Sequence, residues 1–308
     1  MLGLGRPPLG FGPVPTYIGL IFAVQMIIVY VIAVLKKDVD AVLPYISSAA
    51  NKQPQSCIFA MGANISSLLI AVMVHVRYKF TARIIFLNLA FRQAQIDYVV
   101  KTYDDDWDAW KNRLFCVNSW ATIVGHMSAF GLFIVANVQE TAIIPLHITG
   151  ALLAFGGFTI FMMLQCYLTH KLTGVITVIT VFRFRLVFTV LSAIFFVVGL
   201  SFGIIASRVF HSVYPDLPTP RPWSRKIYQP GYVFHQISAA AEWLCAFSQI
   251  IFMQSFTPEF EDMYSAGYIG KNEISSAEPD DVPLPVYEED EEDRRFQRRH
   301  RRYFHDRP

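Results

Sequence analysis

The sequence predicts an all-α, polytopic membrane protein with six transmembrane helices, and three observations lead to this fold class. Hydrophobic residues make up 54% of the 308 residues and charged residues only 16%, far from the average of soluble chains. Six apolar stretches are each at least 20 residues long, the length that a helix needs to cross a hydrocarbon core. Nearly all charges lie between these stretches or after the last of them. The predicted spans are Val14–Leu35, Cys57–Val76, Leu114–Val138, Ala142–Leu168, Leu186–Ser207 and Val233–Phe256.

The first stretch is expected to be a retained helix rather than a cleaved signal peptide. Its 22 uncharged residues exceed the roughly 7–15 apolar residues of a signal peptide, and Val31–Lys37 offers no cleavage site of the small-x-small type. Residues 1–13 then form a short cytosolic segment, and residues 14–256 form the membrane domain. Residues 257–308 contain few apolar residues and carry an acidic run followed by a basic run, so we expect a disordered cytosolic tail.

The chain after the second span stays apolar for longer than a short loop requires. Arg77-Tyr78-Lys79 ends the span, but apolar residues continue as far as Val100, with basic residues between them. Either an interfacial amphipathic helix or a cytosolic extension of the second span would account for this pattern. We expect Asp104–Trp107, which begins with three aspartates, to form a solvated acidic turn.

The third and fourth spans are joined by only Gln139–Thr141, so we expect them to form a tight antiparallel hairpin. In the fourth span, Gly150, Gly156 and Gly157 would let another helix approach closely, as small residues do in membrane bundles. The connection before the sixth span, Arg208–Tyr232, contains five prolines and is expected to be irregular.

The lysine and arginine counts predict how the spans are oriented. With six spans both termini lie on the same side, and that side carries 19 Lys and Arg residues against 7 on the other. Without the tail the counts are still 11 and 7. Since Lys and Arg accumulate in cytosolic loops, we expect both termini to be cytosolic.

The four cysteines are scattered over both sides and the interior of the predicted membrane domain, so no disulfide framework follows. Cys116 and Cys166 lie near the predicted cytosolic ends of their spans, which makes both of them candidates for palmitoylation. The alternative is that both are small buried residues.

Glu242 is the one fully charged residue inside the six predicted spans. An acid at that depth costs roughly 2.5–3.5 kcal/mol to insert and therefore indicates a functional site. At 1.5 Å of helix rise per residue, Glu242 lies roughly 14 Å below the non-cytosolic surface. His235 precedes it by seven residues and shares its helix face.

Nearly all other strongly polar groups of these spans fall in the same non-cytosolic half of the bundle, and the main exceptions are Asn118, His75 and His126. Asn64 lies roughly 10 Å deep and His147 roughly 8 Å deep, whereas Asn137 and Glu140 lie at the surface. The candidate ligand or proton site therefore comprises Glu242, His235, His147, Asn137, Asn64 and Glu140.

Two interpretations of this cluster remain open. Its members could hydrogen-bond one another across helices, as polar residues commonly do in membrane bundles. Alternatively, they form a site for a lipid headgroup, an ion or a proton that opens to the lumen, where histidines titrate at acidic pH.

Enzymatic patterns are not found in the sequence. It contains no HExxH pair, no P-loop, no GxSxG elbow and no GxGxxG followed by a βαβ pattern. We therefore predict no catalytic residue, no metal site, no cofactor and no nucleic-acid partner.

A series of residue blocks follows in order along the chain. The blocks are Pro44–Ser47, Asn64, Arg77–Lys79, Asn118, Ala129–Glu140, His147, Gly150–Phe155, Leu164-Gln165, Tyr232–His235 and Glu242-Trp243. Taken together, they resemble the damage-regulated autophagy modulator (DRAM) family, which is part of a wider superfamily with GPI-anchor lipid-remodelling proteins and a phosphoinositide-kinase recruiter. Two features depart from the family pattern, a longer Phe80–Lys111 segment and an extended tail.

The resemblance implies a six-span membrane protein of lysosomes or endosomes that promotes autophagy and, in some branches, cell death. The plasma membrane and the ER or Golgi are the alternative locations. Expected partners are membrane lipids, together with autophagy or lysosomal proteins that would bind the loop 77–113 and the tail. The main alternative is a transporter, channel or lipid-handling protein that uses the polar cluster around Glu242, and the resemblance to lipid-remodelling proteins also leaves a membrane enzyme open.

Overall fold

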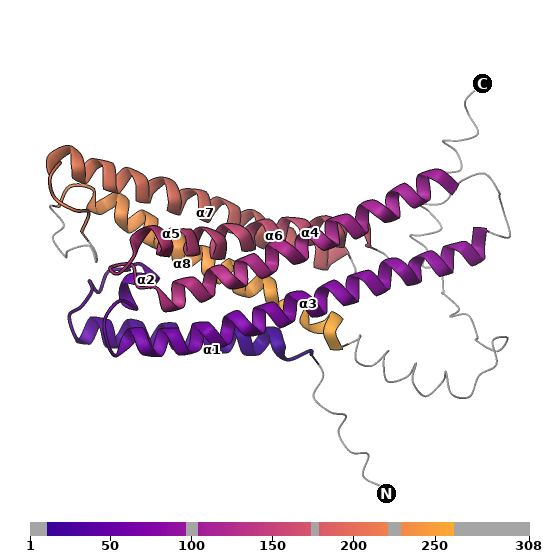
Figure 1. Ribbon diagram of the computed structural model, residues 1–308, viewed down its shortest axis with the longest axis horizontal. Helices are drawn as coiled ribbons and strands as arrows, with labels where there is room; N and C mark the ends of the chain where they lie inside the picture. The colour runs from indigo at the N-terminus through magenta and orange to yellow at the C-terminus, as the bar shows by residue number, and fades with distance from the viewer. Residues whose placement is uncertain (1–10, 97–103, 174–178, 221–228, 262–308) are drawn as a thin grey trace, which may run out of the picture. The chain divides into compact units, whose positions relative to one another are not determined.

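The computed structural model describes residues 11–96, 104–173, 179–220 and 229–261, with side chains outside 86–108. The described chain is built of helices joined by short connections, which confirms the predicted all-α class (Figure 1). We name its two ends by the predicted orientation: the lumenal end holds the α1–α3, α4–α5 and α7–α8 connections, and the cytosolic end lies opposite. The helices are α1 (Val14–Leu35), α2 (Ile46–Ala49), α3 (Gln55–Ile96), α4 (Asp104–Asn137), α5 (Ile144–Ala151), the π-helix η1 (Leu152–Gly157), α6 (Phe158–Lys171), α7 (Ile179–Val213) and α8 (Tyr232–Gln254).

Among the described residues, five helical segments are long and apolar enough to cross a membrane. They coincide with the first five predicted spans and extend most of them. In α7 only 11% of the most apolar window is buried, as expected of a helix that turns most of its surface to lipid. The five segments are Val14–Leu35, Gln55–Ile85, Ala109–Asn137, Ile144–Lys171 and Ile179–Val213.

The last helix, α8, is 23 residues long and lies antiparallel to α1 over the same depth. At its start, the hydroxyl of Tyr232 donates to Asp40, just beyond the end of α1, at 2.9 Å. At its end, the amide of Gln254 donates to the carbonyl of Pro15, in the first turn of α1, at 2.8 Å. This geometry supports α8 as the sixth span and places the start of α1 beside the end of α8. The sixth crossing and the cytosolic location of both termini stay predictions.

The second span continues without a break as α3, from Gln55 to Ile96. Of the two alternatives for the apolar stretch after Lys79, the extension of the span is therefore correct. Asp104 is the first residue of α4, so the prediction of an acidic turn at Asp104–Trp107 is wrong. Acidic residues favour the first turn of a helix because they complement the positive end of its dipole.

The predicted hairpin of the third and fourth spans is confirmed, because α4 packs along α5, η1 and α6. The closest approach is at two glycines, one on each side of the hairpin. A Cβ on Gly131 would lie 2.7 Å from the carbonyl oxygen of Gly150 and 2.6 Å from the backbone nitrogen of Ala154. A Cβ on Gly156 would lie 2.8 Å from the Phe196 ring in α7, so the predicted role of Gly150 and Gly156 in close packing is confirmed.

The fourth crossing contains one turn of π-helix, η1, which the sequence did not predict. A π-helical turn redirects backbone carbonyls away from their α-helical partners. In this case, the hydroxyl of Ser128 donates to the carbonyl of Ala154 at 2.9 Å. The amide of Gln249 in α8 donates to the carbonyl of Phe155 at 2.9 Å. The distorted turn thus ties the fourth crossing to both α4 and α8.

At the cytosolic end, two buried arginines share one carboxylate. The guanidinium of Arg77 in α3 donates to Glu259, and that of Arg185 in α7 donates to the same carboxylate oxygen at 2.9 Å. The ring of Phe256 lies between the two guanidinium groups, 4.9 and 4.6 Å from them. All three charged side chains are at least 94% buried.

These contacts correct two sequence predictions. Arg77 and Arg185 fall just outside the predicted spans Cys57–Val76 and Leu186–Ser207, but their side chains are buried in the bundle. Residues 257–261 were assigned to a disordered tail, but they are helical and Glu259 and Phe260 are buried. The structured domain therefore continues past Phe256, and residues 262–308 lie outside the described part of the chain.

We expect Glu259→Gln to lower the free energy of unfolding by about 3 kcal/mol, because it leaves two buried guanidinium groups without a counter-charge. The measurement is the unfolding midpoint of the detergent-purified protein. Asp216→Asn removes an exposed carboxylate and serves as the control, with an expected change below about 0.5 kcal/mol. Equal midpoints for the two variants would contradict the role of Glu259 as the buried counter-charge of Arg77 and Arg185.

The antiparallel arrangement of α1 and α8 predicts that tags at the two ends of the chain are digested from the same side. In sealed vesicles with the cytosolic face outward, protease should remove both tags without detergent. Protection of one tag alone would show that α8 does not cross the membrane.

Candidate functional site

The first lumenal loop, residues 36–54, is fastened to α8 by its central segment. The indole nitrogen of Trp243 donates to the carbonyl of Pro44 at 2.8 Å. The hydroxyl of Tyr45 donates to Ser238 at 2.6 Å, and the Tyr45 ring meets the His235 ring edge-on at 4.6 Å. Three side chains of α8, one turn or more apart, therefore hold two consecutive loop residues.

The short helix α2 lies between two carboxylates. Glu242 accepts a hydrogen bond from the backbone N–H of Ile46, the first residue of α2. Glu140, in the α4–α5 connection, accepts from the hydroxyls of Ser47 and Ser48 at 3.0 Å each. The N–H groups of a first helical turn have no partner within the helix, so Glu242 supplies a cap from another helix. The two carboxylates also lie close enough for their charges to interact.

The two ends of the loop are held together separately, at Asp38. Asp38 accepts from Lys52 at 3.1 Å and from Gln55 at 2.7 Å. Burial by itself raises the pKa of Asp38, but the hydrogen bonds from Gln55 and Lys52 and the nearby positive charges outweigh burial, so the pKa lies below its ordinary value. Since a carboxyl with a lowered pKa stays ionised in a mildly acidic compartment, this contact persists there.

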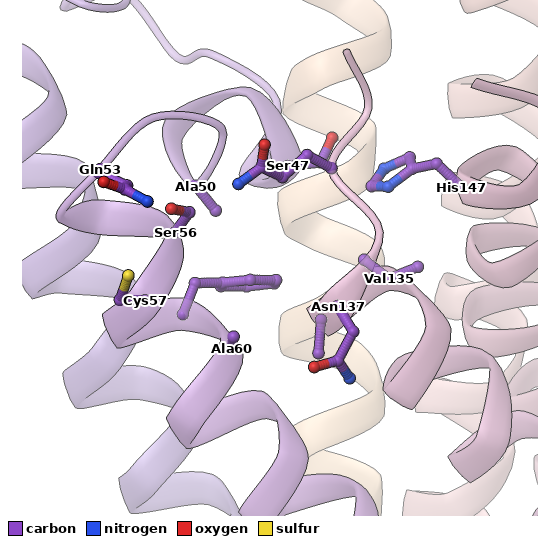
Figure 2. Close-up of a pocket in the computed structure, with 12 residues that line it drawn as sticks. Ser47, Ala50, Gln53, Ser56, Cys57, Ala60, Val135, Asn137 and His147 are labelled. Atoms are coloured by element: carbon purple, nitrogen blue, oxygen red, sulfur yellow. The ribbon is translucent and has the colours of Figure 1, made fainter. Parts of the chain in front are cut away.

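A cavity of about 180 Å³ opens beside α2 at the lumenal end. Its walls come from α2, the start of α3, the end of α4 and α5, and Figure 2 shows Ser56, Cys57 and Ala60 on one side with Asn137 and His147 opposite. The lining residues are Ser47, Ala50, Gln53, Ser56, Cys57, Phe59, Ala60, Val135, Ala136, Asn137, Gln139 and His147.

Two of the six predicted site residues line this cavity, and a third is bonded to one of them. Asn137 exchanges hydrogen bonds with Asn64, at 3.1 and 2.8 Å. His147 lies with its Nδ1 2.6 Å from the carbonyl of Val138. Because a carbonyl oxygen can only accept, Nδ1 carries the proton, and Nε2 of the neutral ring is an acceptor.

The other three predicted residues, Glu140, His235 and Glu242, do not line the cavity. Ser47 connects the two groups, because it lines the cavity and donates to Glu140. The predicted cluster is therefore two groups that meet at α2. Whether it binds a ligand or a proton stays a prediction.

Sequence reasoning missed Gln53 and Ser56 of the cavity lining. Both lie in the irregular turn before α3 and in its first residues, where no helical periodicity marks a face. The only signal was compositional, a run of polar residues between Asn51 and Ser56.

The predicted palmitoylation candidates have different environments. Cys116 is exposed, whereas Cys166 is buried with its sulfur 3.1 Å from the hydroxyl of Thr189. Cys116 is therefore the better candidate of the two, and its acylation stays a prediction. Among the described residues, no three His, Cys, Asp or Glu side chains lie together in a way that could hold a metal ion.

Comparison with known proteins places the whole helical region in one family. Residues 10–263 match the model of the Frag1/DRAM/Sfk1/Cwh43P N-terminal domain. This stretch includes the first lumenal loop, the two glutamates that accept hydrogen bonds from α2, and the cavity lining. No solved structure matches the chain.

Individual relatives are similar over most of their length. DNA damage-regulated autophagy modulator protein 2 from Bos taurus is 27% identical over 253 residues, 82% of this chain and 85% of that protein. DNA damage-regulated autophagy modulator protein 1 from Homo sapiens is 30% identical over 237 residues, 77% of this chain and 85% of that protein. A modulator of macroautophagy, TMEM150B from Danio rerio, is 27% identical over 158 residues, 51% of this chain and 56% of that protein.

We expect Glu242→Ala to free the start of α2, because the Ile46 N–H then loses its acceptor. A hydrogen bond to a charged acceptor contributes about 1.5–3 kcal/mol, so amide hydrogen exchange across residues 45–49 should accelerate about tenfold or more. Glu242→Gln retains an acceptor oxygen and should change exchange less.

Thr149→Ala is the matched control, since within the described part of the chain this hydroxyl bonds only to Pro145 of its own helix. Exchange in residues 45–49 that stays at the wild-type rate in Glu242→Ala would show that Glu242 does not hold α2.

Proposed function

Because the chain belongs to the Frag1/DRAM/Sfk1/Cwh43P family, we propose that it is a multi-pass membrane regulator of autophagy that acts at lysosomal or endosomal membranes. The observation that carries the proposal is the family match over residues 10–263. Relatives that match most of this chain are named autophagy modulators. The lysosomal or endosomal location goes beyond the family match and the names of the relatives, and it is part of the proposal.

A regulatory rather than catalytic role is supported by how the carboxylates are used. Glu140 and Glu242 both accept hydrogen bonds from α2, and Glu140 is only 3% exposed. Carboxylates engaged in this way hold a loop in place. They are less suited to proton transfer to a substrate, which requires the substrate within hydrogen-bond reach.

Partner binding is proposed for the cytosolic extensions of α3 and α4. α3 continues past Val76, where the predicted second span ends, to Ile96, and α4 begins at Asp104, before the predicted third span starts at Leu114. These two extensions face the predicted cytosolic side. They offer helical surfaces outside the membrane on which autophagy or lysosomal proteins could dock.

A second candidate function is lipid handling or transport through the lumenal end. The observation that favours it is the cavity beside α2, which a purely structural loop does not require. In this reading the ligand enters the cavity whose wall contains Asn137 and His147.

The first experiment measures autophagic flux in cells with and without the gene, together with the location of a tagged copy. We expect flux to fall by at least half on loss of the gene and the tag to overlap with lysosomes or endosomes. Residence at the plasma membrane with unchanged flux would contradict the proposal.

Rescue with variants separates the two candidate functions. Replacing residues 88–103 by a flexible linker of equal length should abolish rescue in a regulator that recruits partners there, whereas Glu242→Gln should rescue fully. A transporter predicts the opposite pattern, and also loss of pH-dependent flux by Glu242→Gln in reconstituted vesicles.

A further inference from the structure

The cavity beside α2 is large enough for one small ring-shaped group. Its volume of about 180 Å³ equals the share of about six water molecules in the liquid, at about 30 Å³ each. A single six-membered sugar ring with its hydroxyls fits this space, whereas a complete lipid headgroup with a phosphate and a second substituent does not.

The chemistry of the lining excludes a charged ligand. None of the residues that line the cavity is Lys, Arg, Asp or Glu, so a buried ion would lose its hydration without gaining a counter-charge. An anion would also meet Glu140, whose carboxylate lies directly behind Ser47 in the wall. The ligand that this lining suits is therefore uncharged.

The polar part of the lining combines donors and acceptors that the described chain does not use. The amides of Gln53 and Gln139 and the hydroxyl of Ser56 make no hydrogen bond within the described residues, and Nε2 of His147 is an acceptor. Amides and hydroxyls both donate and accept. A ligand group that also does both, the hydroxyl, satisfies such a mixed set best.

The rest of the lining is apolar and lies among the polar residues, with Ala50 beside Gln53 and Ser56 (Figure 2). Phe59 is only 3% exposed and contributes an aromatic ring, and Ala60 and Val135 contribute methyl groups. A lining that mixes polar with apolar groups suits a ring that carries hydroxyls at its edge and C–H bonds on its face.

From this match we propose that the cavity binds an uncharged polyhydroxyl ring, a hexose or a cyclic polyol, by its hydroxyls. The group comes either from the headgroup of a lumenal-leaflet glycolipid or from a free sugar in the lumen. The inference rests on the second candidate function, lipid handling or transport, and specifies its ligand class.

The test uses the full-length protein in nanodiscs. Glucosylceramide in phosphatidylcholine is the lipid probe, phosphatidylcholine alone is the blank, and glucose is the free probe. Binding is measured by competition against a fluorescent glucosylceramide and by native mass spectrometry. We expect glucosylceramide to bind at least tenfold more tightly than phosphatidylcholine.

Two mild substitutions report on the cavity. Gln139→Leu changes an exposed side chain, and Ser56→Ala removes a single hydroxyl. Each should weaken glucosylceramide binding about tenfold, because each removes about one hydrogen bond and leaves its partner unsatisfied. Thr149→Ala, on α5 but outside the cavity lining, should bind as the wild type does. Matching unfolding midpoints for the three variants exclude a folding defect.

The outcomes separate the two sources of the ring. Competition by glucosylceramide but not by glucose assigns the group to a glycolipid. Competition by glucose, with the same sensitivity to Gln139→Leu, assigns it to a free sugar. Binding of neither probe, or binding that both variants leave unchanged, overturns the proposal. Because autophagic flux is measured separately, a normal dependence of flux on the gene without any sugar binding would refute the ligand and leave the regulator proposal intact.

Discussion

The hydrogen bond between the Ile46 N–H and Glu242 fixes how the lumenal end is built. A loop that folds back against transmembrane helices has few water molecules to satisfy its backbone, so the bundle must supply the partners. α8 does this with one carboxylate on the first turn of α2 and one indole on the carbonyl of Pro44. With α2 fixed in this way, its next residues reach Glu140 and form one wall of the cavity. Glu242, the one acidic or basic residue among the Asp, Glu, Lys and Arg types in α8, is therefore a contact that orders this loop.

At the cytosolic end, the bundle likewise supplies the partners of a polar segment, but here the partners are positively charged. There two arginines from α3 and α7 hold one carboxylate just beyond α8, and the ring of Phe256 fills the space between them. Because breaking a buried ion pair leaves an uncompensated charge, such a triad is costly to open. The chain therefore leaves α8 at a fixed place, and the start of α1 is bonded to the same helix through Gln254. Polar contacts at both ends hold α8 in register with its neighbours, while the apolar side chains between them supply packing.

Hydropathy predicted the fold class and the positions of the first five spans because the length of an apolar run is a local property of the sequence. It also identified Glu242, since a single charge in such a run is conspicuous. The same method placed Arg77, Arg185 and Glu259 outside the predicted spans, because each lies just beyond one end of an apolar run and its partners come from other helices. The π-helical turn and the cavity were likewise beyond prediction: both depend on which side chains of distant helices meet, as with Gln249 and the Phe155 carbonyl. Asn64 and Asn137 were correctly grouped, although as neighbours in depth rather than as a hydrogen-bonded pair.

Ser47 links the two functions that this end of the molecule can serve. Its hydroxyl donates to Glu140 and so helps to hold α2. Ser47 also lines the cavity, and a hydroxyl that donates can still accept a hydrogen bond. A ligand hydroxyl that donates to Ser47 leaves the bond to Glu140 intact and strengthens it, because chains of hydrogen bonds polarise one another. Ligand binding would then stabilise the loop that α8 already holds. A ligand that can only accept would have to compete with Glu140 for the single Ser47 proton and would loosen α2. The wall of the cavity therefore favours hydroxyl-bearing ligands for a reason independent of its size, namely that only these are compatible with the attachment of the loop.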